Sequence, residues 1–261
     1  MPRFAANVSM LFTEVGFLDR PAAAAAAGFT GVECMFPYHH PAEDLADRLD
    51  AAGIPMVLFN APPGDYAAGE RGLAALKGRE SEFRDSLQVA LAYAETIDCP
   101  RIHVLAGVVA EADIPAALDT YLANLIYAAD ECEAQGVRVM IEPIVMDDYL
   151  LSRPDQAVEI IRQLEHNNVR LQYDIHHAQL AQGGISVFLE NHFDIIEHIQ
   201  VAGVPGRHEP DALSEVNWRF LFALLDSHGY GGWVGAEYKP RAATLAGLGW
   251  ARDWGIGGTT S

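Results

Sequence analysis

Eight short apolar runs recur along this chain of 261 residues, and longer amphipathic stretches separate them. Runs that are apolar throughout are typical of parallel strands that are buried on both faces. Eight strand–helix units in a chain of this length favour the α/β class and a (β/α)8 barrel, which needs about 250 residues. We therefore predict one barrel domain over residues 1–261, with strands at 3–10, 31–36, 55–60, 101–107, 137–143, 169–174, 197–203 and 233–238.

The stretches between the runs carry helical patterns. Phe83, Leu87 and Leu91 recur at the spacing that places them on one face of a helix. We predict helices at 41–53, 81–97, 153–167 and 217–229. A doubly wound open sheet is the alternative architecture, but no glycine-rich phosphate-binding pattern follows the first strand, so the barrel is favoured.

Composition restricts the partners and the compartment. The formal net charge is −19 at pH 7, whereas binding to nucleic acid requires clustered Lys and Arg. No apolar run reaches the roughly 20 residues that span a bilayer, and the N-terminus lacks the pattern of a secretory signal. We therefore predict a cytoplasmic protein with no nucleic-acid partner and no membrane contact.

Polar residues stand where several predicted strands end, and in a barrel the active site forms at the carboxyl ends of the strands. Like charges gathered there repel one another unless a proton or a cation lies between them. Three carboxylates and an amide oxygen favour a hard divalent ion, Mg²⁺ or Mn²⁺. The predicted metal ligands are Glu142, Asp174, Gln200 and Glu237. The alternative for Gln200 is a hydrogen bond to neighbouring backbone.

Two of these carboxylates also suit acid–base catalysis. Glu142 and Glu237 come from the ends of the fifth and eighth predicted strands, so a substrate between them would have one carboxylate on each side. One could remove a proton from carbon while the other returns it to the neighbouring carbon. A metal ion would neutralise the charge that develops on the enediolate oxygens.

These residues lie in stretches that resemble the hydroxypyruvate isomerase family of xylose-isomerase-like barrels. The stretches include "GVECMFPY", "IEPI", "LQYDIHHAQ", "HIQVAGVPGRHEP" and "GAEYKPR", and the resemblance extends from residue 2 to about residue 250. It is strongest to the 2-oxo-tetronate isomerases of that family. The resemblance implies the same four metal ligands, with Glu142 and Glu237 as the proton-transferring pair. The implied reactions convert 2-oxo-tetronate into 3-oxo-tetronate, or hydroxypyruvate into tartronate semialdehyde.

A small anionic hydroxy-oxo acid must also be paired with positive charge. Arg207 is the first candidate, because its planar guanidinium can bind both oxygens of a carboxylate. Lys239, two residues after Glu237, is the second candidate, and a solvated rim position is its alternative. His177 and His208 complete the predicted substrate-binding residues.

Two other functions remain open. A ketose 3-epimerase would use a similar metal and a similar pair of carboxylates, but would return the proton to the carbon from which it came. A non-catalytic barrel that binds a sugar acid would need neither the metal nor the paired glutamates. Barrels of this size often pair, so a homo-oligomer is also expected.

Overall fold

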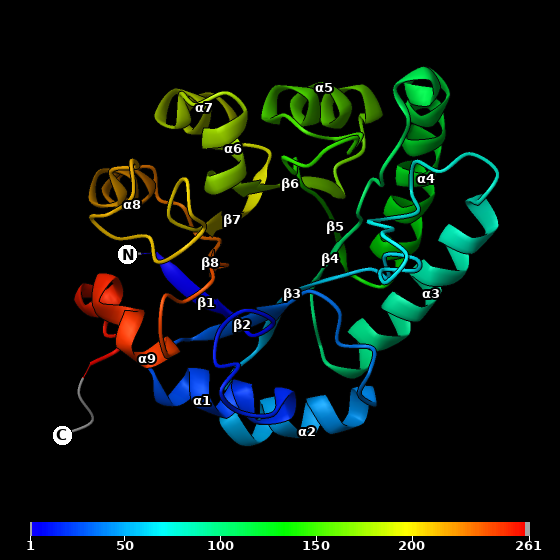
Figure 1. Cartoon of the computed structure of the whole chain (residues 1–261). Helices are drawn as coiled ribbons and strands as arrows, with labels where there is room; N and C mark the ends of the chain where they lie inside the picture. The colour runs from blue at the N-terminus through cyan, green and yellow to red at the C-terminus, as the bar shows by residue number, and fades with distance from the viewer. Residues whose placement is uncertain (1, 259–261) are drawn as a thin grey trace.

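The computed structural model of the chain describes residues 2–258; residues 1 and 259–261 of the predicted domain lie outside the described residues. Its parallel strands close in sequence order into one barrel, which confirms the predicted (β/α)8 fold (Figure 1). The strands are β1 (Arg3–Asn7), β2 (Gly31–Cys34), β3 (Met56–Asn60), β4 (Arg101–His103), β5 (Arg138–Ile141), β6 (Val169–Asp174), β7 (Ile196–Val201) and β8 (Trp233–Ala236).

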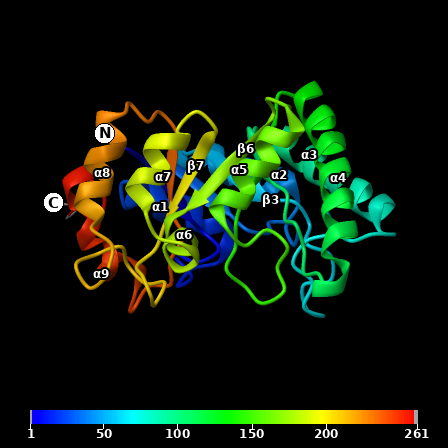
Figure 2. The same cartoon turned by 90° about the horizontal axis from the view of Figure 1, so that it is seen from above.

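Helices surround the strands on the outside of the barrel (Figure 1). They are α1 (Arg20–Ala26), α2 (Ala42–Ala52), α3 (Glu80–Thr96), α4 (Ile114–Ala134), α5 (Pro154–Leu164), α6 (Ile175–Ala181), α7 (Ile185–His192), α8 (Trp218–Ser227) and α9 (Thr244–Gly247). Residues 2–258 also form three 3-10 turns, at Phe17–Asp19, Glu111–Asp113 and Leu248–Trp254. The loops that follow β5 and β7 project from the same face of the barrel (Figure 2). In the described part of the chain, no helix is both long and apolar enough to cross a bilayer.

The four predicted helices form within a few residues of their expected bounds, but some strands are shorter than their apolar runs. The run at 101–107 forms a strand only as far as His103. Beyond Val104, the backbone bonds to loops instead of to the sheet: Ala75 N donates to the Ala106 carbonyl, and Leu150 N donates to the Gly107 carbonyl. An apolar run thus marks burial, and burial continues past the end of the strand.

Polar side chains occupy the barrel interior just beneath the mouth. Glu33 of β2 and His198 of β7 are fully buried there, and Gln200 lies beside them. Charged side chains are rarely buried without a partner. His198 Nε2 lies 2.6 Å from Glu33 Oε2, so the carboxylate is paired inside the barrel.

Gly235 of β8 leaves the space that the Glu33 carboxylate occupies, because a Cβ atom at this position would collide with both carboxylate oxygens. Three side chains hold Glu33 by hydrogen bonds, so it cannot move aside freely. We expect Gly235→Ala to lower the free energy of unfolding by about 1–3 kcal/mol, the usual cost of overpacking, in denaturant titrations. Gly231→Ala is the control, since its Cβ would meet nothing within 4 Å among the described residues. Equal stability of the two variants would contradict this account.

Candidate active site

The barrel brings the four predicted ligands to one mouth. Asp174 is the last residue of β6, and Gln200 is the penultimate residue of β7. Glu142 follows β5 directly, and Glu237 follows β8 directly. All four side chains are buried. Asp174 also caps α6, because its Oδ1 accepts a hydrogen bond of 2.7 Å from the His176 backbone N–H. This bond leaves Oδ2 to face the site.

The buried carboxylates repel one another. Burial and the negative charges of Glu237 and Asp174 raise the pKa of Glu142 well above its ordinary value. Burial likewise raises the pKa of Glu237 to about 7, although nearby Arg207 opposes the rise. Each carboxylate therefore holds a proton more readily than a free glutamate, and a cation between them would relieve the repulsion.

Arg207 supplies positive charge at this place. Its backbone adopts the left-handed conformation, with φ of 53°, in the loop after β7. Its Nη2 lies 2.5 Å from Glu237 Oε2 and 3.4 Å from Asp174 Oδ2. Burial alone would lower the pKa of Arg207, but the negative charges of Glu237 and Asp174 outweigh burial and raise this pKa. Arg207 Nε is buried and has no hydrogen-bond partner in the described structure.

His177 lies with two of the carboxylates. Single ligand atoms of Glu142, Asp174 and His177 approach within 4.8 Å of one another, and such a buried group could hold a metal ion. However, His177 Nδ1 accepts a hydrogen bond of 3.2 Å from the Val145 backbone N–H. Burial lowers the pKa of His177 to about 4, so the ring is neutral and its proton lies on Nε2. In this tautomer Nε2 faces Asp174 as a donor and offers no lone pair to a metal.

His208 and Lys239 lie outside the cluster. His208 Nδ1 lies 2.8 Å from the Lys239 carbonyl oxygen, and the Lys239 N–H donates to the Arg207 carbonyl at 2.8 Å. The Lys239 side chain is exposed. These contacts join the loop after β7 to the loop after β8, so in this structure both residues support Arg207.

A hydrogen-bonded chain runs below the mouth and was missed in the sequence analysis. Gln172 Nε2 donates to Glu142 Oε2 and to Gln200 Oε1, each at 2.7 Å. Gln200 Nε2 in turn donates to Glu33 Oε1 at 2.8 Å. Gln172 lies two residues before Asp174, and the two-residue repeat of a strand could have indicated that both point into the barrel.

A second branch reaches the other glutamate. Asn7, the last residue of β1, donates through Nδ2 to Glu33 Oε1 and to Glu237 Oε1, each at 3.1 Å. Asn7 was not among the residues predicted at the ends of the strands. Glu142 and Glu237 are thereby joined through side chains that lie inside the barrel.

This fold and this mouth identify a family. Residues 21–254 match the family model described as a xylose isomerase-like TIM barrel. The chain belongs to the xylose isomerase-like barrels. The predicted family is therefore confirmed at the level of the superfamily fold.

Xylose isomerase-like relatives align with nearly the whole chain. A 2-oxo-tetronate isomerase of Cupriavidus necator is 52% identical over 97% of this chain and 99% of its own length. The hydroxypyruvate isomerase of Escherichia coli is 40% identical over 96% and 98%. A crystal structure described as AP endonuclease, family 2, from Brucella melitensis is 44% identical, with a TM-score of 0.95 over 97% of this chain and 99% of that one. The two named isomerases confirm both the resemblance to the hydroxypyruvate isomerase family and the prediction of an isomerase.

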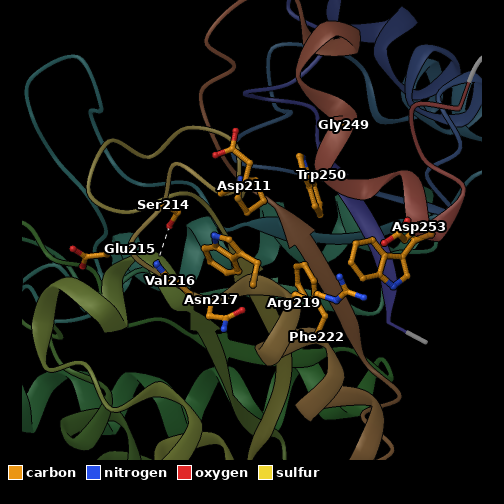
Figure 3. Close-up of a pocket in the computed structure, with 14 residues that line it drawn as sticks. Asp211, Ser214, Glu215, Val216, Asn217, Arg219, Phe222, Gly249, Trp250 and Asp253 are labelled. Carbon is orange, nitrogen blue, oxygen red and sulfur yellow. Dashed lines mark hydrogen bonds between the residues drawn. The ribbon is translucent and has the colours of Figure 1, made fainter.

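An open groove of about 580 Å³ lies elsewhere on this xylose isomerase-like barrel. Figure 3 shows Trp250 and Asp253 of the C-terminal segment on one wall, with Asp211 and Ser214 of the loop after β7 on the other. Its described lining includes none of the predicted site residues. The groove is therefore separate from the buried carboxylates at the strand ends.

Proposed function

We propose that the protein is an isomerase that moves a proton between adjacent carbons of a small hydroxy-oxo acid. The observation that carries the proposal is the pair of buried glutamates at the barrel mouth, Glu142 and Glu237, whose pKa values are both raised. A general acid or base works best with a pKa near the working pH. The names of the relatives give the substrate class: 2-oxo-tetronate or hydroxypyruvate.

The donor set fits a divalent cation, Mg²⁺ or Mn²⁺. Glu142, Asp174 and Glu237 offer carboxylate oxygens, and Gln200 offers Oε1, which has a second lone pair beside the one that Gln172 occupies. Hard divalent ions prefer such oxygen donors. When bound, the cation would neutralise negative charge on the substrate oxygens.

The remaining groups bind and orient the substrate. Arg207, with its unpaired buried Nε, would pair with the substrate carboxylate. His177 would donate from Nε2 to a substrate oxygen, because Val145 fixes its tautomer. One glutamate then removes a proton from carbon to give an enediolate, the hydroxyl proton passes to the former carbonyl oxygen, and the other glutamate returns a proton to the adjacent carbon.

A test of the proposal is proton NMR in D₂O, with hydroxypyruvate and 2-oxo-tetronate in separate samples that contain Mg²⁺ or Mn²⁺. We expect product with deuterium at the receiving carbon, because a carboxylate at the mouth exchanges its proton with solvent before the return step. The faster sample identifies the preferred substrate. Product without deuterium would contradict proton transfer and favour hydride transfer, and deuterium in unconverted substrate alone would favour an epimerase.

A nucleic-acid substrate is the second candidate, because the Brucella relative is described as an AP endonuclease. This chain carries 36 acidic residues against 17 Lys and Arg. A phosphate backbone would meet repulsion over most of such a surface. We therefore propose a small anionic substrate, held by the local positive charge of Arg207.

A further inference from the structure

Glu33 is a buried carboxylate at the centre of the interior hydrogen-bonded chain. Its Oε1 accepts from Gln200 Nε2 at 2.8 Å and from Asn7 Nδ2 at 3.1 Å. Its Oε2 lies 2.6 Å from His198 Nε2. The Gln200 and Asn7 partners are amide nitrogens, which can only donate, so Glu33 Oε1 accepts from both. These hydrogen bonds join Glu33 to side chains inside the barrel.

An acceptor that cannot donate decides which way a neighbouring amide points. Gln200 could place either its oxygen or its nitrogen toward the mouth, because the two ends of an amide have the same shape. If the Gln200 oxygen faced Glu33, it would be repelled by the carboxylate oxygen. The Gln200 nitrogen in the same place donates a hydrogen bond to it. Gln200 therefore turns Nε2 to Glu33, which leaves Oε1 to accept from Gln172 Nε2 and to offer its second lone pair to the proposed cation.

The same reasoning extends to the partners of the two glutamates. Gln172 donates both to Gln200 Oε1 and to Glu142 Oε2, which is the only polarity that suits both acceptors. Asn7 keeps its Oδ1 for the Ser9 backbone N–H at 3.1 Å, so its Nδ2 faces Glu33 and Glu237. The side-chain amides of Gln172, Gln200 and Asn7 thus each donate a hydrogen bond to a carboxylate.

We propose that Glu33 is a positioning residue that directs the oxygen of Gln200 toward the divalent cation. Glu33 thereby also fixes the direction of the hydrogen bonds along the interior row of side chains. The inference rests on the cation site of the proposed function. It assigns Glu33 no contact with substrate. It explains why a buried carboxylate and a space-making glycine, Gly235, lie beneath the mouth.

The test is Mn²⁺ binding to the whole protein, measured by EPR of the free ion. Glu33→Gln keeps the shape but introduces an amide that donates as well as accepts, so the direction of Gln200 is no longer imposed. We expect Mn²⁺ affinity to fall about tenfold or more, the usual effect of changing a group that holds a metal ligand. Circular dichroism and thermal unfolding, recorded in parallel, separate a loss of affinity from a loss of fold.

A rescue variant makes the test specific. In the double variant Glu33→Gln/Gln200→Glu, the amide at 33 can donate to a carboxylate at 200, which must offer an oxygen to the mouth in either orientation. We expect this variant to recover most of the lost affinity, and it serves as the test on its own if the single variant does not fold. The control is Glu197→Gln, which removes a glutamate from the same strand as Gln200. Glu197 lies away from the mouth and forms an ion pair of 3.0 Å with Arg101.

The outcomes separate this inference from the proposed function. If the native protein binds Mn²⁺ and Glu33→Gln binds it equally well, the positioning role is wrong while the proposed function stands. A double variant that folds but binds as weakly as the single variant also overturns the role. If the native protein binds no Mn²⁺, the proposed cation site is wrong and the inference is overturned with it.

Discussion

Glu142→Gln and Glu237→Gln should each lower kcat by about 10²–10⁴-fold, the usual contribution of a general acid or base. Glutamine keeps the size of the side chain and one oxygen ligand, but it cannot accept a proton from carbon. Binding of the substrate should therefore stay detectable by calorimetry while turnover is lost. The measurements are steady-state kinetics with the preferred acid and a calorimetric titration of each variant.

The matched control for this pair is Glu190→Gln, at an exposed position on α7, which should keep native kinetics. Full turnover in both site variants would show that the acid–base assignment is wrong. Loss of binding together with turnover would show that the carboxylates serve the substrate complex and not only proton transfer.

Arg207→Gln should raise KM by about 30-fold or more, which corresponds to about 2 kcal/mol, the lower range for truncating a buried charge pair. The reason is that Arg207 would pair with the substrate carboxylate while it neutralises Glu237 and Asp174. Arg207 lowers the pKa of Glu237, so its removal should raise that pKa. The acid limb of the kcat/KM profile should then move to higher pH.

Arg219→Gln is the control for Arg207, because Arg219 is exposed on α8. Its KM and its pH profile should match those of the native protein. A native KM in Arg207→Gln would mean that another group, such as Lys239, pairs with the substrate carboxylate.

The mouth was predictable because strand ends have a fixed place in a barrel. The apolar runs that precede Glu142, Asp174, Gln200 and Glu237 mark strands, and parallel strands of a closed barrel deliver their last residues to one face. A residue at the end of such a run can therefore be placed at the mouth of the barrel from the sequence alone. This reasoning depends on strand identity alone, so it needed no contact between distant residues.

The hydrogen-bond partners were not predictable in the same way. Strand periodicity could place Gln172 inside the barrel, but it does not identify the groups that Gln172 or Asn7 contacts. These partners include Glu142 and Glu237, which lie 30 and 230 positions away along the chain. The tautomer of His177 likewise depends on the backbone of Val145, 32 positions away.

The sequence by itself therefore determined the barrel, the family and the acidic ends of the strands, since periodic burial and local motifs are properties of neighbouring residues. The tertiary structure alone decided that Arg207 lies between Glu237 and Asp174, that His177 faces the site as a donor, and that Glu33 directs the interior amides. The physical reason is that charge pairing and hydrogen-bond direction act over a few ångströms in space, and only folding brings those groups within that range.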